Sequence, residues 1–310
     1  MIAAMPPKVT IHALNRVFAS LDALRNGQAF YALLSSFCLA GLMLASAESA
    51  LSRSDTLWGV IWAGLGLISA FLGVNTTGLL LMDQACGRPV RDVVDAFYSA
   101  LRSAPKILLC LLMLLGAVAL ALVALLGLLW LVRLPWVGAP LFVLLVPLGV
   151  VFLGVTAFSG LLLVGPLTGP SVWAGNSAQG TARMLWRQLR RGALEAATLM
   201  MAVFLVTGLV SAAVSFIVIT GGRVLAFLTV WLIGLDVPAQ QLMAGLFGYG
   251  LRSMGSAGAP MAATPLGMAA LVGGGAVFAV ALVLPTLVYL RGCCAAYLAL
   301  QDSSSDDMSL

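Results

Sequence analysis

The chain has 310 residues, of which 62% are hydrophobic and 9% charged, and its formal net charge is +5. A soluble globular protein carries roughly 25% charged residues, so this composition excludes a water-soluble globular fold. It also argues against nucleic-acid binding, because the basic residues stand in short stretches beside apolar segments and no nucleic-acid motif is present.

Long apolar stretches along the chain are the first structural signal, because a membrane-spanning helix needs ~20 apolar residues. Such stretches are predicted to be helices over residues 29–47, 57–82, 107–132, 140–164, 193–220 and 267–290. They are apolar on all sides, without the strict alternation of a barrel strand. The predicted fold class is an all-α polytopic membrane protein with six transmembrane helices.

A basic amphipathic segment precedes each pair of predicted spans, over residues 8–25, 90–103 and 181–191. In the second segment, Arg91 and Asp95 have the i, i+4 spacing of an exposed helical ion pair. The third segment has one basic helical face, formed by Arg183, Arg187, Arg190 and Arg191. We expect this face to contact anionic lipid headgroups, or alternatively an acidic cytoplasmic partner.

The string Gly78-Leu79-Leu80-Leu81 returns as Gly160-Leu161-Leu162-Leu163, each time before a Gly/Pro break and an amphipathic segment. This recurrence predicts three parallel repeats, each an amphipathic helix followed by a two-span hairpin. The predicted units are residues 1–82, 83–164 and 165–300, followed by a disordered tail over 301–310. The third unit adds an irregular outer segment over 221–266, in which residues 224–235 are too short to cross the membrane and suggest a re-entrant or interfacial helix.

The distribution of basic residues predicts the orientation. Six spans place both termini on one side, which then holds twelve of the sixteen lysines and arginines. By the positive-inside rule, that side is the cytoplasm.

Residues that could carry chemistry are few. His12 is the one histidine, and the zinc-hydrolase, phosphate-loop and Gly-x-Ser-x-Gly motifs are absent. We therefore expect no enzymatic activity, no cofactor and no metal site. If a solute pathway exists, its candidate residues are an intramembrane acid, a polar residue in a span and two helix-bending prolines. These are Glu195, Asn75, Pro147 and Pro285.

Three features have plain structural explanations. Glu195 is better explained as an interfacial carboxylate beside Arg190 and Arg191 than as a gate or proton-coupled group. Cys293-Cys294 is better explained as a pair of small apolar residues packed at a helix end than as an acylation site. The stripe Gly41, Ala45 and Ser49 suits close helix packing, either within the chain or between subunits.

The segment Gly160–Pro170, followed by the arginine-rich helix, carries a family resemblance. Its layout resembles a group of bacterial inner-membrane proteins that includes the YciC-like proteins and the membrane-anchor region of some glycerophosphodiester phosphodiesterases. The resemblance covers most of residues 84–220 and implies repeated helix-plus-hairpin units in a bacterial inner membrane. The chain has no counterpart of the phosphodiesterase catalytic domain, so that activity is not implied.

Together these features predict a non-enzymatic accessory or scaffold protein of the inner membrane. Its expected partners are membrane lipids with anionic headgroups, and partner subunits or a second copy of the chain. The alternative is a transporter or channel for a lipidic or small neutral solute.

Overall fold

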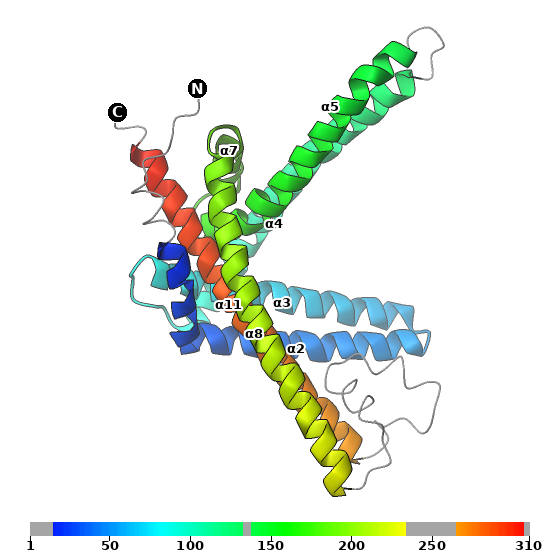
Figure 1. Cartoon of the computed structure of the whole chain (residues 1–310), viewed down its shortest axis with the longest axis vertical. Helices are drawn as coiled ribbons and strands as arrows, with labels where there is room; N and C mark the ends of the chain where they lie inside the picture. Colours follow the sequence, from blue (N-terminus) through cyan, green and yellow to red (C-terminus); the bar gives the residue numbers. More distant parts are fainter. Residues whose placement is uncertain (1–14, 133–137, 234–264, 307–310) are drawn as a thin grey trace. The chain divides into compact units, whose positions relative to one another are not determined.

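The fold is built from helices, which the computed structural model describes over residues 15–132, 138–233 and 265–306 (Figure 1). Within these residues every regular element is helical, which confirms the all-α prediction. The elements in chain order are η1 (Ala19–Arg25), α2 (Gly27–Ser52), α3 (Thr56–Ala85), α4 (Val93–Leu131), α5 (Gly138–Ser159), the π-helical turn η2 (Gly160–Val164), α6 (Gly165–Trp173), α7 (Ala178–Arg191), α8 (Ala193–Ile233) and α11 (Pro265–Asp306).

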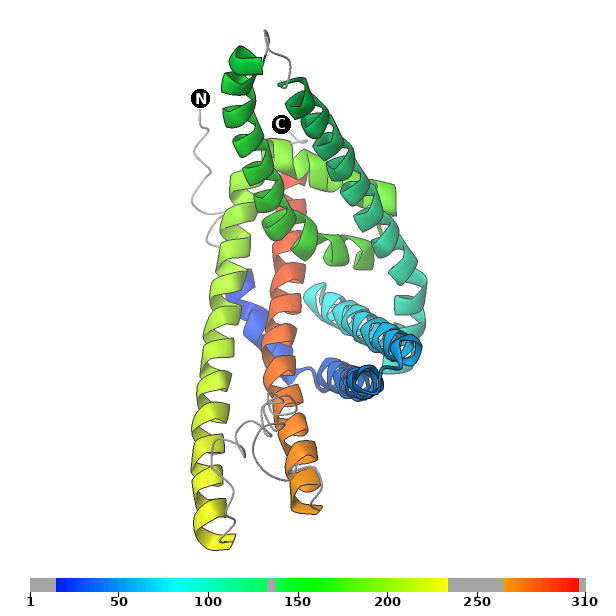
Figure 2. The same ribbon diagram turned by 90° about the vertical axis from the view of Figure 1, so that its right-hand side faces the viewer.

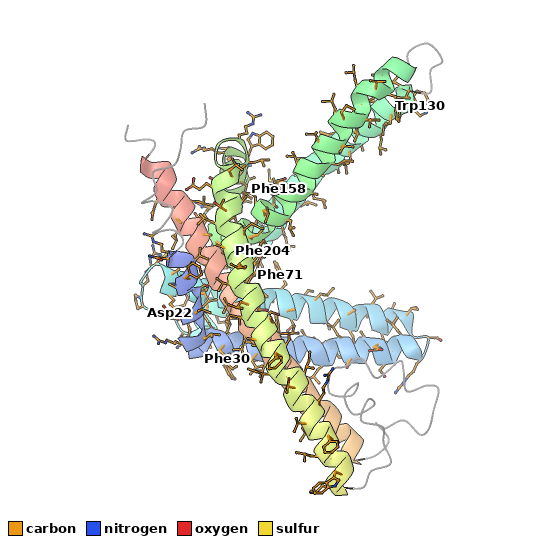
Figure 3. All side chains as sticks on the ribbon, in the orientation of Figure 1. Asp22, Phe30, Phe71, Trp130, Phe158 and Phe204 are labelled. Carbon is orange, nitrogen blue, oxygen red and sulfur yellow. The ribbon has the colours of Figure 1, made fainter. Side chains whose placement is uncertain are left out.

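Membrane-spanning character follows from helix length and apolarity. Among the described residues, six segments are long and apolar enough to cross a bilayer: Gly27–Leu51, Thr56–Ala85, Val93–Leu131, Leu141–Trp173, Ala193–Thr229 and Ala279–Asp302. The chain is therefore an integral, polytopic membrane protein, as its sequence predicts. Along the α4–α5 hairpin (Figures 1 and 2), large apolar side chains project outward, Trp130 and Phe158 among them (Figure 3).

α4 differs from the prediction because it is one continuous helix of 39 residues. The sequence predicts a separate amphipathic helix over 90–103 and a span over 107–132, because polar residues extend up to Lys106. Polarity alone does not end a helix, and α4 continues through Pro105 although this residue removes the backbone hydrogen bond to the Leu101 carbonyl and crowds that carbonyl. Residues 93–106 therefore extend the span.

α8 corrects a second prediction. It continues to Ile233, so residues 224–233 are not a separate re-entrant or interfacial helix. Gly221-Gly222 lowers helix propensity by about 1 kcal/mol per residue, which long apolar flanks on both sides outweigh. The rest of the predicted irregular segment, residues 234–264, lies outside the described residues.

α11 corrects a third prediction, because it ends at Asp306 and residues 301–306 are helical rather than part of a disordered tail. Residues 296–301 are mostly good helix formers. In addition, Arg16 Nη1 lies 2.6 Å from Asp302 Oδ2. This contact joins the N-terminal segment to the end of α11. Residues 307–310 lie outside the described part.

The chain folds into two compact units. Unit 1 comprises the residues up to Ser20, then Gly78–Phe204 and Leu290 onward, and unit 2 comprises Leu21–Thr77 and Leu205–Tyr289. The first and third predicted repeats contribute to both units, whereas the second lies within unit 1. Compactness and internal duplication are separate properties, so the division into three repeats stays a prediction.

In unit 2, α2 and α3 form an antiparallel hairpin (Figure 1) whose contact depends on glycines spaced by seven. Gly59, Gly66 and Gly73 follow the heptad period that keeps one face toward a partner helix. A Cβ on these glycines would lie 2.6 Å from Leu51, 3.1 Å from Leu44 and 2.2 Å from Ser36, respectively. The stripe Gly41, Ala45 and Ser49 is exposed and takes no part in this contact, so packing between subunits stays a prediction for it.

Replacing Gly73 with leucine is expected to destabilise this hairpin. The added side chain would overlap Ser36, and overpacking of this kind costs about 1–3 kcal/mol. Gly64→Leu is the matched control, because nothing lies within 4 Å of a Cβ at that position in the same helix. SDS titration in mixed micelles would measure both free energies of unfolding, and equal losses for the two variants would contradict the packing.

In unit 1, α4 packs against α6 and α7 through small residues. Ala96, Ala100 and Ser103 are buried, whereas bulky apolar neighbours are exposed. The exposed side chains of this segment include Val94, Phe97, Tyr98 and Leu101. Small residues allow close helix approach, so the row of Ala96, Ala100 and Ser103 suits packing within unit 1.

Candidate functional site

α7 is a strongly amphipathic helix of unit 1. Its first turn is capped by Ser177, whose Oγ accepts from the Gly180 N–H (3.1 Å). Its inner face buries Ala178, Thr181 and Leu185, and the helix packs against α4 and α6. Because its apolar face is covered by protein, α7 does not need lipid to bury that face.

The outer face of α7, which we call the arginine face, consists of Arg183, Trp186, Arg187 and Arg190. All four side chains are exposed, and Trp186 is 54% exposed. The guanidinium carbon of Arg190 lies 4.6 Å from the Trp186 ring centroid, within cation–π range. Of the four arginines predicted to share this face, Arg191 is the last residue of α7 and its side chain lies outside the described part.

A buried hydrogen-bonded cluster connects α6, α7 and α11. Asn176 Nδ2 donates to Ser171 Oγ (3.0 Å) and to Tyr297 Oη (3.0 Å). Ser171 Oγ and Thr181 Oγ1 lie 3.1 Å apart. Gly175, at φ +102°, ends α6 and turns the chain so that Asn176 reaches both partners. We call Ser171, Asn176, Thr181 and Tyr297 the polar cluster, which joins α6, α7 and α11.

Tyr297→Phe is expected to lower the free energy of unfolding by about 1 kcal/mol, the net worth of a typical hydrogen bond. Tyr297 is buried, and its hydroxyl accepts from an amide whose partners come from α6 and α11. Tyr98→Phe is the control, because Tyr98 is exposed. Unfolding in mixed micelles would measure the free energies of unfolding of both variants. A Tyr297→Phe protein as stable as the control would contradict a structural role for the polar cluster.

Asp83 and Arg91 form a second polar contact in unit 1. Arg91 Nε and Nη2 lie 2.6 and 2.8 Å from the two carboxylate oxygens of Asp83, and Nη1 donates to Ser99 Oγ (3.4 Å). Asp83 is buried, and its hydrogen bond raises the pKa of Arg91. The predicted i, i+4 pair with Asp95 does not form as expected, because Arg91 precedes the first residue of α4 and turns back to α3.

The candidate pathway residues lie in different units. Glu195 is half-buried in the first turn of α8 and Pro147 is exposed on α5, both in unit 1. Asn75 is buried in unit 2 and its Nδ2 donates to the Phe71 carbonyl (2.8 Å) of its own helix. Pro285 is half-buried in unit 2, and α5 and α11 continue through their prolines without a break.

The two Gly-Leu-Leu-Leu copies have different structures. Gly78 lies in α3, where an added Cβ would be 2.3 Å from the Trp173 ring. Gly160 opens the π-helical turn η2, and nothing lies within 4 Å of a Cβ there. The first glycine therefore makes room for Trp173, whereas the second coincides with an irregular turn of the kind that is frequent at functional sites.

The cysteine pair behaves as the plainer explanation predicts. Cys293 and Cys294 are both buried, among Gly292, Ala295 and Ala296. An added Cβ at Gly292 would lie 2.8 Å from Val203 of α8, so α11 and α8 are closely packed here. The end of α11 is thus a core element of unit 1, which its position after the last predicted span did not indicate.

Comparison with known proteins adds no relative: no family model, no curated protein and no solved structure matches the chain. The resemblance of residues 84–220 to the YciC-like layout therefore stays a prediction.

Proposed function

We propose that this protein is a non-enzymatic accessory or scaffold protein of the bacterial inner membrane, with both termini in the cytoplasm. The observation that carries the proposal is the difference between the inner and outer faces of α7. Its inner face packs against α4 and α6, and the polar cluster joins helices of unit 1, whereas its outer face presents Arg183, Arg187 and Arg190 as exposed side chains. A rigid element with a charged outer face is suited to contacting lipid or a partner subunit.

The orientation of this face follows from charge. The side that carries the termini and the amphipathic segments holds most of the basic residues, which favours the cytoplasm. The contact between Arg16 and Asp302 supports the placement of both ends on one side. The arginine face would then meet the inner leaflet or a cytoplasmic partner.

Affinity purification from membranes in mild detergent tests the proposal. We expect a stoichiometric partner or a defined lipid to remain with the wild-type protein, and to be lost from Arg183→Gln/Arg187→Gln. Arg53→Gln/Arg223→Gln removes the same charge from exposed positions elsewhere and should retain it. Recovery of neither partner nor defined lipid with the wild type would contradict an accessory or scaffold role.

A transporter or channel for a lipidic or small neutral solute is the second candidate. One observation favours it: η2 interrupts regular α-helical geometry between α5 and α6 within a predicted span. Such turns free backbone groups inside membrane proteins. Flux of a neutral solute panel into reconstituted vesicles tests this candidate, and vesicles as tight as protein-free ones would exclude it for those solutes.

A further inference from the structure

The arginine face lies on a narrow part of the α7 surface. At 3.6 residues per turn, Gln179, Arg183, Trp186, Arg187 and Arg190 fall on one side of the helix, and these five side chains are exposed. α7 contains no aspartate or glutamate. Positive charge is therefore concentrated on one surface without local neutralisation within the helix.

A rigid junction holds this face next to an apolar span. Gly192 is the one residue between α7 and α8. Its N–H donates to the Gln188 carbonyl (2.9 Å), and Gln188 Nε2 donates back to the Gly192 carbonyl (3.1 Å). An added Cβ at Gly192 would lie 2.3 Å from Gln188 Nε2. This tight turn fixes the distance between the arginines and the start of α8.

The start of α8 faces outward with apolar side chains. Leu194 is 79% exposed and Met201 is 62% exposed. In a membrane protein such residues face acyl chains, so the lipid headgroup region begins within a turn or two of Arg190. Trp186 lies on the arginine face, and tryptophan is enriched at this boundary between apolar and aqueous phases. An acidic soluble partner would account for the arginines but not for Trp186.

We propose that the arginine face of α7 is a binding site for the headgroup of an anionic phospholipid, in which Arg183 and Arg187 contact the phosphate and Trp186 lies at the level of the ester groups. Guanidinium groups donate two parallel hydrogen bonds to phosphate oxygens, which suits a phosphodiester better than a single point charge would. The site deepens the proposed function, because it assigns a lipid rather than a protein to the face.

The test uses the full-length purified protein in a neutral detergent, with phosphatidylglycerol, phosphatidylcholine, inorganic phosphate and polyglutamate as probes. We expect phosphatidylglycerol to raise the melting temperature saturably and phosphatidylcholine, phosphate and polyglutamate to leave it unchanged. Arg183→Gln/Arg187→Gln should raise the phosphatidylglycerol concentration at half-saturation at least about tenfold. This factor corresponds to roughly 1.4 kcal/mol for the loss of charged contacts. Arg53→Gln/Arg223→Gln should bind as the wild type does.

Three outcomes would overturn the proposal. Equal effects of phosphatidylglycerol on both double variants would place its binding elsewhere on the protein. A shift by inorganic phosphate alone at the same concentration would make the site one for free phosphate, and a shift by polyglutamate alone would make it one for an acidic protein. Failure to purify a protein partner would count against the scaffold role but would leave the lipid result as it stands.

Discussion

Replacing Arg91 with glutamine is expected to lower the free energy of unfolding by about 2–3 kcal/mol. The substitution leaves the Asp83 carboxylate buried without its bidentate partner, and removal of one member of a fully buried pair costs roughly 3–5 kcal/mol. The Arg91 side chain is 34% exposed, so water screens part of the interaction and reduces the expected loss.

Two further variants separate the ion pair from a general effect of charge removal. Arg88→Gln removes a charge from an exposed position in the same loop and should change stability by less than about 0.5 kcal/mol. Asp83→Asn in the Arg91→Gln background removes the buried charge and should recover part of the loss. SDS titration of each protein measures these values, and equal stability of Arg91→Gln and Arg88→Gln would show that the pair is not structural.

Gly78→Ala should destabilise unit 1 by about 1–3 kcal/mol through overpacking. The new methyl group would lie 2.3 Å from the Trp173 ring, which also approaches Gly169. Trp173 is largely buried and cannot shift without disturbing the end of α6. The same unfolding measurement applies.

Gly160→Ala is the control for Gly78→Ala, because it alters the equivalent position of the second Gly-Leu-Leu-Leu copy. Nothing lies near a Cβ at Gly160, so we expect a change below about 1 kcal/mol. Trp173→Leu should relieve the clash, so the double variant with Gly78→Ala should lose less than the sum of the two single losses. Additive losses would contradict direct contact.

The spans were predictable because their signal is local. Residues 107–132 contain no charged residue, and such an apolar stretch is recognised without knowledge of any other segment. Helix continuity was harder to predict: α4 passes through Pro105 and α8 passes through Gly221-Gly222. Propensity penalties of ~1–3 kcal/mol do not end a helix that long apolar flanks support.

The site was predictable only where one helix defines it. The spacing of Arg183, Arg187 and Arg190 along α7 identifies the arginine face without knowledge of any other segment. The contact between Asn176 and Tyr297 joins residues 121 positions apart, which no local pattern reveals. Asp83 was likewise hidden, because the nearer spacing of Arg91 and Asp95 suggested a different partner. Gly59, Gly66 and Gly73 recur every seven residues, a packing signal that the sequence does contain.

Membrane topology tests the central claim most directly, namely that both termini and α7 lie on the cytoplasmic side of an integral six-span protein. An epitope tag would be placed in the exposed turn at Ser54 in one protein and after Leu310 in another. In inverted membrane vesicles, protease should remove the tag after Leu310 and spare the tag at Ser54, and spheroplasts should give the opposite result. The reverse pattern, or cleavage of both tags from the same side, would contradict the account.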